Sequence, residues 1–187
     1  MEIKTIKVGF LETNCYILTI NDKCLIIDPG DEADKIIKNI DKDVIGILIT
    51  HYHFDHIGAL NSLKDKYKCS IYDINNCKSN MEIGPFKFET IITKGHKDDC
   101  ITYYFRDNQM MFVGDFIFKG SIGRCDLEGG NYDEMLKSIE LIKKYDDDIK
   151  VYPGHGDETT LLYEKQNNPY FKDVNLWYLL VVKLWNI

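Results

Sequence analysis

All five histidines of this chain fall at the end of a predicted strand or in the turn that follows one. Two aspartates are placed in the same way. The seven side chains are His51, His53, Asp55, His56, His96, Asp115 and His155. They follow four separate apolar runs, and a rigid sheet presents functional groups at its strand ends. This placement predicts a sheet-based fold with one functional site built from several strands.

The apolar runs and turn residues predict the elements around this site. The predicted strands are Ile3–Val8, Thr13–Ile20, Cys24–Asp28, Val44–Thr50, Cys69–Tyr72, Phe86–Thr93, Ile101–Phe105, Met110–Gly114 and Ile149–Tyr152. The predicted helices are Asp31–Ile40 with Asp31 as its cap, Gly58–Tyr67, Tyr132–Tyr145 and Asp157–Gln166. The stretch Asn75–Asn80 is predicted to be a loop. Strand meanders followed by helices favour an α/β sandwich of mixed sheets.

Length and composition narrow the class of protein. The chain has 187 residues, which fits one domain over residues 1–187, with 174–187 as an extension that is either a packing segment or a dimer contact. The oligomeric state stays open. A net charge of -7 opposes nucleic-acid binding. The apolar segment Leu176–Ile187 is too short to span a membrane.

The cysteines and the N-terminal segment predict a cytoplasmic protein. Six cysteines are spread along the chain without a Cys-x-x-Cys pair, so we expect reduced and mostly buried thiols. The first ten residues alternate lysine with apolar residues and contain no signal-peptide core. A reducing compartment is therefore the expected location.

The segment from Thr50 to Gly58 is dense in possible metal ligands. Imidazole and carboxylate together suit zinc, iron or manganese, whereas calcium and magnesium prefer oxygen alone. The His-x-His spacing does not fit one face of a helix, which predicts that the ligands lie on an irregular turn. Zinc is the first expectation, with iron or manganese as alternatives.

The number of donors predicts two divalent metal ions. A single catalytic zinc ion takes three protein ligands and keeps one position open. The five histidines with Asp55 and Asp115 exceed that requirement. Two ions that share one carboxylate would each receive three ligands of their own.

Four motifs together resemble the metallo-β-lactamase fold family, and more narrowly its small glyoxalase II-like (hydroxyacylglutathione hydrolase-like) members. They are His51-x-His53-x-Asp55-His56, Thr93-x-Gly95-His96, Gly114-Asp115 and Gly154-His155-Gly156. The resemblance implies an αββα sandwich of two mixed β-sheets flanked by helices. It also implies that the first ion is bound by His51, His53 and His96, the second by Asp55, His56 and His155, and that Asp115 bridges them.

The resemblance further implies a hydrolase of S-lactoylglutathione-like or other small acyl thioesters that uses a metal-bridging hydroxide. Two ions lower the pKa of a shared water towards neutrality, and a thiolate leaves without much help from an acid. Asp55 would also orient the hydroxide. Asp28 supports the ligands or only forms a turn, and Arg124 binds a substrate carboxylate or forms a surface ion pair. Tyr52 and Phe54 line the pocket mouth or wall off the metals.

Other activities of the same fold remain as alternatives. A persulfide dioxygenase would hold one iron and consume oxygen. A nuclease would need a basic surface, and a non-catalytic scaffold would not need seven filled ligand positions. Full-length glyoxalase II enzymes carry an additional C-terminal helical domain that contacts glutathione, so we expect this shorter chain to hold the glutathione part loosely.

Overall fold

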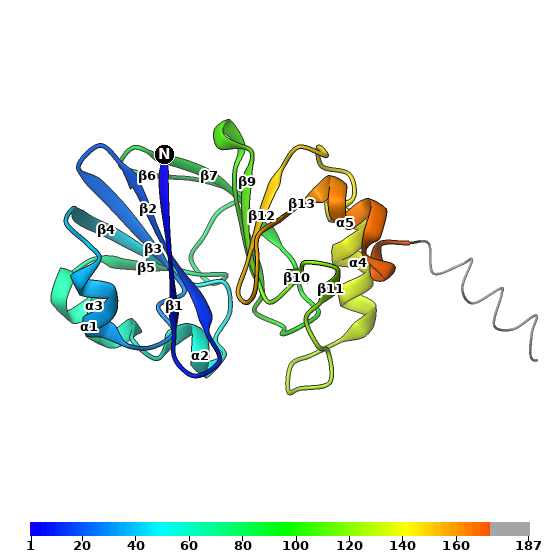
Figure 1. The fold of residues 1–187 in the computed structure, drawn as a ribbon, viewed down its shortest axis with the longest axis horizontal. Coiled ribbons are helices and arrows are strands. Elements are labelled where there is room, and N and C mark those ends of the chain that lie inside the picture. The colour runs from blue at the N-terminus through cyan, green and yellow to red at the C-terminus, as the bar shows by residue number, and fades with distance from the viewer. Residues whose placement is uncertain (173–187) are drawn as a thin grey trace, which may run out of the picture.

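The computed structural model describes residues 1–172, and the predicted extension 174–187 lies outside the described residues. Two mixed β-sheets lie face to face with helices on both outer sides, as predicted. Figure 1 shows α1 and α3 on the left, α4 and α5 on the right, and the two sheets between them. The expected αββα sandwich is confirmed.

The first sheet contains five strands and the second contains six. The first has the order β1 (Glu2–Val8), β2 (Thr13–Ile20), β3 (Lys23–Ile27), β4 (Asp43–Leu48) and β5 (Ser70–Tyr72). The second has the order β13 (Thr159–Thr160), β12 (Lys150–Pro153), β9 (Met110–Gly114), β8 (Ile101–Phe105), β7 (Phe86–Ile92) and β6 (Asn80–Ile83). A small hairpin joins β10 (Ile117–Phe118) to β11 (Ser121–Ile122).

Helices cover the outer face of each sheet. They are α1 (Ala33–Lys38), α2 (Phe54–Ile57), α3 (Leu60–Tyr67), α4 (Tyr132–Ile142) and α5 (Leu161–Asn167), with 3-10 turns at Arg106–Asn108 and Pro169–Phe171. Ile36 of α1 and Leu63 of α3 pack on the first sheet, and Met135 and Ile139 of α4 pack on the second.

Side-chain alternation along the strands builds three apolar layers. In β2, Cys15 and Ile17 face the helices, while Tyr16 and Leu18 point into the space between the sheets. Successive side chains of a strand point to opposite faces, and here both faces are covered. The central strands are therefore apolar at nearly every position.

Three helix starts differ from the prediction, and α3 begins at Leu60 instead of Gly58. Glu32 adopts a left-handed backbone with a φ of 51°, so α1 begins at Ala33 and Asp31 does not cap it. Thr159 and Thr160 pair with β12 as a short strand, which delays α5 to Leu161.

The turn after β4 is only partly irregular. His51 and His53 lie outside any helix or strand, as expected, but Asp55 and His56 lie in the short helix α2, which the ligand spacing did not predict. Strand β6 was also missed. It has four residues, of which Asn80 and Glu82 are polar and exposed, and it pairs with β7 at the edge of the sheet.

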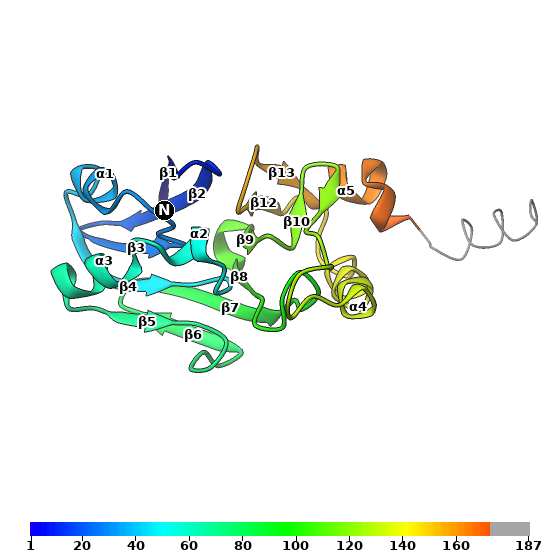
Figure 2. The ribbon, with the colours of Figure 1, turned by 90° about the horizontal axis from the view of Figure 1, so that it is seen from below.

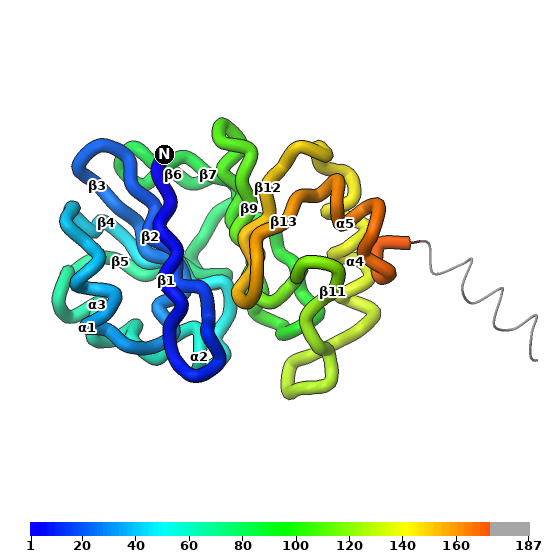
Figure 3. The backbone as a smooth tube through the Cα atoms, in the orientation of Figure 1, coloured from blue at the N-terminus to red at the C-terminus, as the bar shows by residue number. Residues whose placement is uncertain are grey.

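The topology gathers the strand ends that carry the predicted ligands. The parallel pairs β3–β4 and β9–β12 place carboxyl ends of both sheets at one edge. The edge is held together by Asn14, whose backbone N–H donates to the Gly154 carbonyl at 2.7 Å, and by the Tyr16 hydroxyl, which donates to the Pro153 carbonyl at 2.6 Å. Figure 3 shows the blue tube of β2 and the orange tube of β12 approaching each other near the middle of the molecule.

None of the helices in residues 1–172 is both long enough and apolar enough to cross a bilayer.

Candidate metal centre

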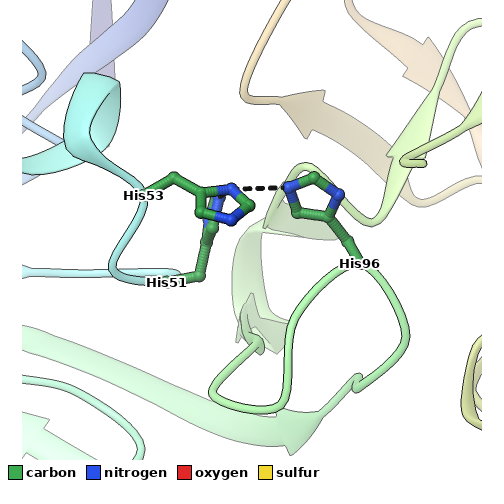
Figure 4. Close-up of side chains that lie close together, drawn as sticks. All are labelled: His51, His53 and His96. Carbon is green, nitrogen blue, oxygen red and sulfur yellow. Dashed lines mark hydrogen bonds between the residues drawn. The ribbon is translucent and has the colours of Figure 1, made fainter. Parts of the chain in front are cut away.

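Three histidines from two loops form the first cluster of donors. His51 and His53 follow β4, and His96 comes from the loop after β7 (Figure 4). His53 Nδ1 lies 3.1 Å from His51 Nε2 and 2.8 Å from His96 Nε2. Three ring nitrogens thus converge on one point, which is the arrangement expected for the first ion.

A second cluster lies beside it and contains Asp55, His56 and His155. Asp55 Oδ2 lies 3.2 Å from His155 Nε2 and 3.5 Å from His56 Nε2. Asp55 and His56 come from α2, which Figure 2 shows at the boundary between the two sheets. His155 follows β12, so this cluster draws on both halves of the sandwich.

Asp115 lies between the two clusters. Its Oδ2 is 3.6 Å from His96 Nε2 and 3.5 Å from His155 Nε2, and its Oδ1 is 3.3 Å from His56 Nε2. One carboxylate therefore faces donors of the first cluster and donors of the second. This is the position required of a bridging ligand, and all seven predicted donors meet here.

Two buried atoms show that the cluster fits a cation. Among the described residues, His56 Nε2 and Asp115 Oδ1 are fully buried without a hydrogen-bond partner. An unpaired buried polar atom is costly in a protein interior, and both atoms lie beside the shared space between the clusters. Metal coordination would satisfy both of them.

Backbone carbonyls set the orientation of two rings. His96 Nδ1 donates to the Arg124 carbonyl at 2.7 Å, and His155 Nδ1 donates to the Leu11 carbonyl at 3.1 Å. A carbonyl oxygen only accepts, so Nδ1 carries the proton and Nε2 keeps its lone pair for a metal. The sequence contained no signal for these supports because they come from the main chain.

Asp28 is a supporting carboxylate and not only a turn residue. It is buried, and it accepts a hydrogen bond from His56 Nδ1 at 2.9 Å. Asp55 is held in a similar way by the Thr13 hydroxyl, which donates to its Oδ2 at 2.9 Å. Both ligands of α2 are therefore held in place by a hydrogen bond from or to another side chain.

Three carboxylates, those of Asp28, Asp55 and Asp115, favour positive charge on the rings of His56 and His155. Burial lowers the pKa of His56, but the carboxylates of Asp28 and Asp115 outweigh burial and raise it to about 10. Burial likewise lowers the pKa of His155, but the hydrogen bonds that its ring donates to Asp115 and Asp55 outweigh burial and raise it to about 9. Protons hold these positions in the metal-free protein, and divalent ions would displace them.

We expect the affinity for metal to increase with pH. Binding at Nε2 requires His56 and His155 to lose their extra protons. Between pH 6.5 and 9, each displaced proton should therefore increase the apparent affinity by up to about tenfold for each unit of pH. Calorimetric Zn²⁺ titrations across this range, in buffers of different ionisation enthalpy, measure both the affinity and the protons released. An affinity that is constant over the range contradicts this expectation.

The stability of the metal-free protein should decrease as the pH rises. Both pKa values lie above the ordinary value of 6.5, so these protons stabilise the fold fully below about pH 6.5. That contribution is lost as the pH rises through 9 to 10.

Three further predicted residues lie around the cluster. Arg124 is exposed, and its guanidinium pairs with both carboxylate oxygens of Asp126 at 2.7 Å; its role in substrate binding stays a prediction. Phe54 is 65% exposed and stacks on Phe10 with ring centroids 6.3 Å apart. The Tyr52 hydroxyl donates to Asp73 at 2.5 Å, an anchor that the sequence did not indicate.

Comparison with known proteins agrees with this geometry. The family model described as the metallo-beta-lactamase superfamily matches residues 8–74 and 80–155. The chain is 35% identical to the probable metallo-hydrolase YqgX of Bacillus subtilis, over 94% of this chain and 100% of that protein. It is 30% identical to the hydroxyacylglutathione hydrolase GloC of Haemophilus influenzae, over 91% of this chain and 98% of that protein.

Solved structures show the same architecture. The B3 metallo-beta-lactamase BLEG-1 superposes with a TM-score of 0.88 at 29% identity, covering 91% of this chain and 100% of that one. TTHA1623 in a di-iron-bound form superposes with a TM-score of 0.82 at 26% identity, covering 89% and 99%. ETHE1 from Myxococcus xanthus superposes with a TM-score of 0.85 at 23% identity, covering 100% of this chain and 92% of that one. At this identity the likeness shows the fold alone.

A four-layer sandwich with clustered histidines and aspartates at its strand ends defines a metal-binding α/β protein. More specifically, the chain belongs to the metallo-beta-lactamase superfamily. Its members bind divalent metals, and the donors for such ions are present here.

Proposed function

We propose that this protein is a two-metal hydrolase of small acyl thioesters, S-lactoylglutathione-like compounds among them. The observation that carries the proposal is the position of Asp115, which faces donors of both clusters. The likeness to GloC supports the thioester as the substrate class. The di-iron form of TTHA1623 supports two ions, with zinc proposed first and iron as an alternative.

When bound, two divalent ions supply a Lewis acid for the substrate carbonyl and lower the pKa of a water molecule. The residues of the chain hold and orient the reacting groups. The Asp55 carboxylate lies beside the His155 ring, and a hydrogen bond from the Thr13 hydroxyl fixes its Oδ2. We therefore assign Asp55 the role of orienting the attacking water. A thiolate leaving group has a conjugate pKa of about 8.5, so the site requires no strong general acid.

The experiment that tests the proposal combines metal content with substrate turnover. Protein purified with excess Zn²⁺, Fe²⁺ or Mn²⁺ should contain two ions per chain by elemental analysis. It should hydrolyse acyl thioesters faster than matched lactones or β-lactams. One robust metal equivalent together with full thioesterase activity would contradict the two-metal mechanism.

The same measurements separate the alternative activity, a persulfide dioxygenase with one iron. The likeness to ETHE1 concerns the fold alone and does not favour it. That enzyme would contain a single iron and consume oxygen in the presence of a persulfide. Neither is expected of a site in which both donor clusters are complete.

We expect weak discrimination between thiols. Two basic side chains next to ligand loops are already paired: Arg124 with Asp126, and Lys97 with Asp99 at 2.7 Å. Carboxylates of glutathione would have to compete with these ion pairs. We therefore expect kcat/KM for one acyl group on glutathione to exceed that on a small neutral thiol by less than about a thousandfold, or roughly 4 kcal/mol. A larger preference would indicate a dedicated glutathione site.

The expected location is part of the proposal. All six cysteines are free thiols, and Cys15, Cys24 and Cys100 are buried. Free thiols are typical of a reducing compartment, which supports the cytoplasm. We propose a small molecule as the substrate, and neither a nucleic acid nor a membrane as a partner.

A further inference from the structure

One buried hydrogen-bond chain reaches both donor clusters from behind. The Thr50 hydroxyl donates to Asp28 Oδ2 at 2.6 Å, and the same oxygen accepts from His56 Nδ1 at 2.9 Å. On its other side, the Thr50 hydroxyl lies 3.1 Å from His51 Nδ1. His51 belongs to the first cluster and His56 to the second, and all four side chains are buried.

The direction of each bond in this chain follows from the carboxylate. Asp28 can only accept when ionised, so the single proton of the Thr50 hydroxyl points to it. The hydroxyl oxygen is then left to accept from His51 Nδ1. Both His51 and His56 consequently carry their proton on Nδ1 and direct the Nε2 lone pair at the metal site.

The position of the chain is fixed independently of the ligands. The Thr50 backbone N–H donates to Asp28 Oδ1 at 2.8 Å, which holds the second carboxylate oxygen. A Cβ at Gly114, the residue before the bridging Asp115, would lie 2.3 Å from the Thr50 hydroxyl oxygen. The absence of a side chain at Gly114 therefore leaves the room that this hydroxyl occupies.

We propose that Thr50 and Asp28 form one relay that fixes the tautomer and orientation of a ligand in each cluster, so that the two metal sites depend on a single support. Thr50 is a positioning residue in this scheme and touches neither ion. The inference rests on the two-ion site of the proposed function. It adds that cutting the relay at Thr50 weakens both ions, although Thr50 hydrogen-bonds to a ligand of the first cluster only.

Single-site backgrounds allow each ion to be measured separately. His53→Ala removes a ligand of the first cluster and leaves Asp55, His56 and His155 complete. His155→Ala leaves the first cluster complete. In each background the affinity for the remaining Zn²⁺ is measured by calorimetry, which needs no substrate and no activity.

We expect Thr50→Val to lower the Zn²⁺ affinity by about tenfold or more in both backgrounds. Thr50→Ser, which restores the hydroxyl, should restore the affinity in both. The matched control is Thr13→Val, because the Thr13 hydroxyl supports Asp55 of the second cluster and no ligand of the first. It should weaken the ion in the His53→Ala background and leave the affinity in the His155→Ala background unchanged.

The outcomes distinguish the relay from the two-ion site itself. A loss confined to the His155→Ala background, or no loss in either, would overturn the relay while the wild-type protein still binds two ions. A loss that Thr50→Ser does not restore would also overturn it. A wild-type protein that takes up a single ion would overturn the two-ion site, and this inference with it.

Discussion

Asp115→Ala should abolish the binding of both ions and lower kcat/KM for a thioester by at least about a thousandfold, or roughly 4 kcal/mol of transition-state stabilisation. The physical reason is that, among the carboxylates of residues 1–172, only that of Asp115 faces both clusters, within 3.6 Å of His96, His155 and His56. Its negative charge is retained in spite of burial, because the neighbouring His155 and His56 rings hold the pKa of this carboxyl well below its usual range. Removal leaves five histidines and one carboxylate to attract two dications.

The measurement is metal content together with turnover, and Asp98→Ala is the control. Asp98 lies two residues after His96, but its side chain is 71% exposed. The Asp98→Ala variant should therefore bind two ions and keep nearly unchanged activity. Thermal unfolding of the metal-free proteins shows whether Asp115→Ala still folds. Asp115→Asn keeps the size of the side chain and removes its charge. If this variant keeps two ions and a near-normal rate, the carboxylate is not the bridge.

The seven donors were predictable because histidine is rare in this chain and each one follows an apolar run. Strand ends converge at one edge of a sheet, so a pattern along the chain becomes a cluster in space. The sequence also indicated the sandwich itself, from strand meanders followed by helices, and strands such as β3 and β9 are apolar at nearly every position. Such strands require cover on both faces.

The supports of the donors were not predictable to the same extent. Two of them are the main-chain carbonyls of Leu11 and Arg124, which any residue type would provide. Thr50 and Asp28 were visible in the sequence, but a threonine in a strand and an aspartate before a proline have common structural explanations. Their joint role depends on β3 and β4 lying side by side, and only the structure shows this pairing.

A methyl group added at Gly154 should reach the centre of the metal site. A Cβ there would lie 2.2 Å from Asp115 Oδ1 and 2.7 Å from His56 Cε1, both far inside van der Waals contact. The Gly154 backbone cannot move away easily, because its N–H donates to the Gly114 carbonyl at 2.8 Å and its carbonyl accepts from the Asn14 N–H at 2.7 Å. The methyl group therefore displaces the bridging carboxylate or the His56 ring.

We expect Gly154→Ala to lose the second ion and to lower kcat/KM by at least about a hundredfold, since small displacements of reacting groups cost this much. Gly120→Ala is the demanding control. Gly120 has a φ of +76°, so alanine there costs about 1 to 2 kcal/mol of stability, but its Cβ would meet open space. Elemental analysis and thermal unfolding should thus separate the variants: Gly120→Ala destabilises the protein and retains two ions, whereas Gly154→Ala loses metal. If Gly154→Ala retains both ions and full activity, Asp115 and His56 do not lie where the structure places them.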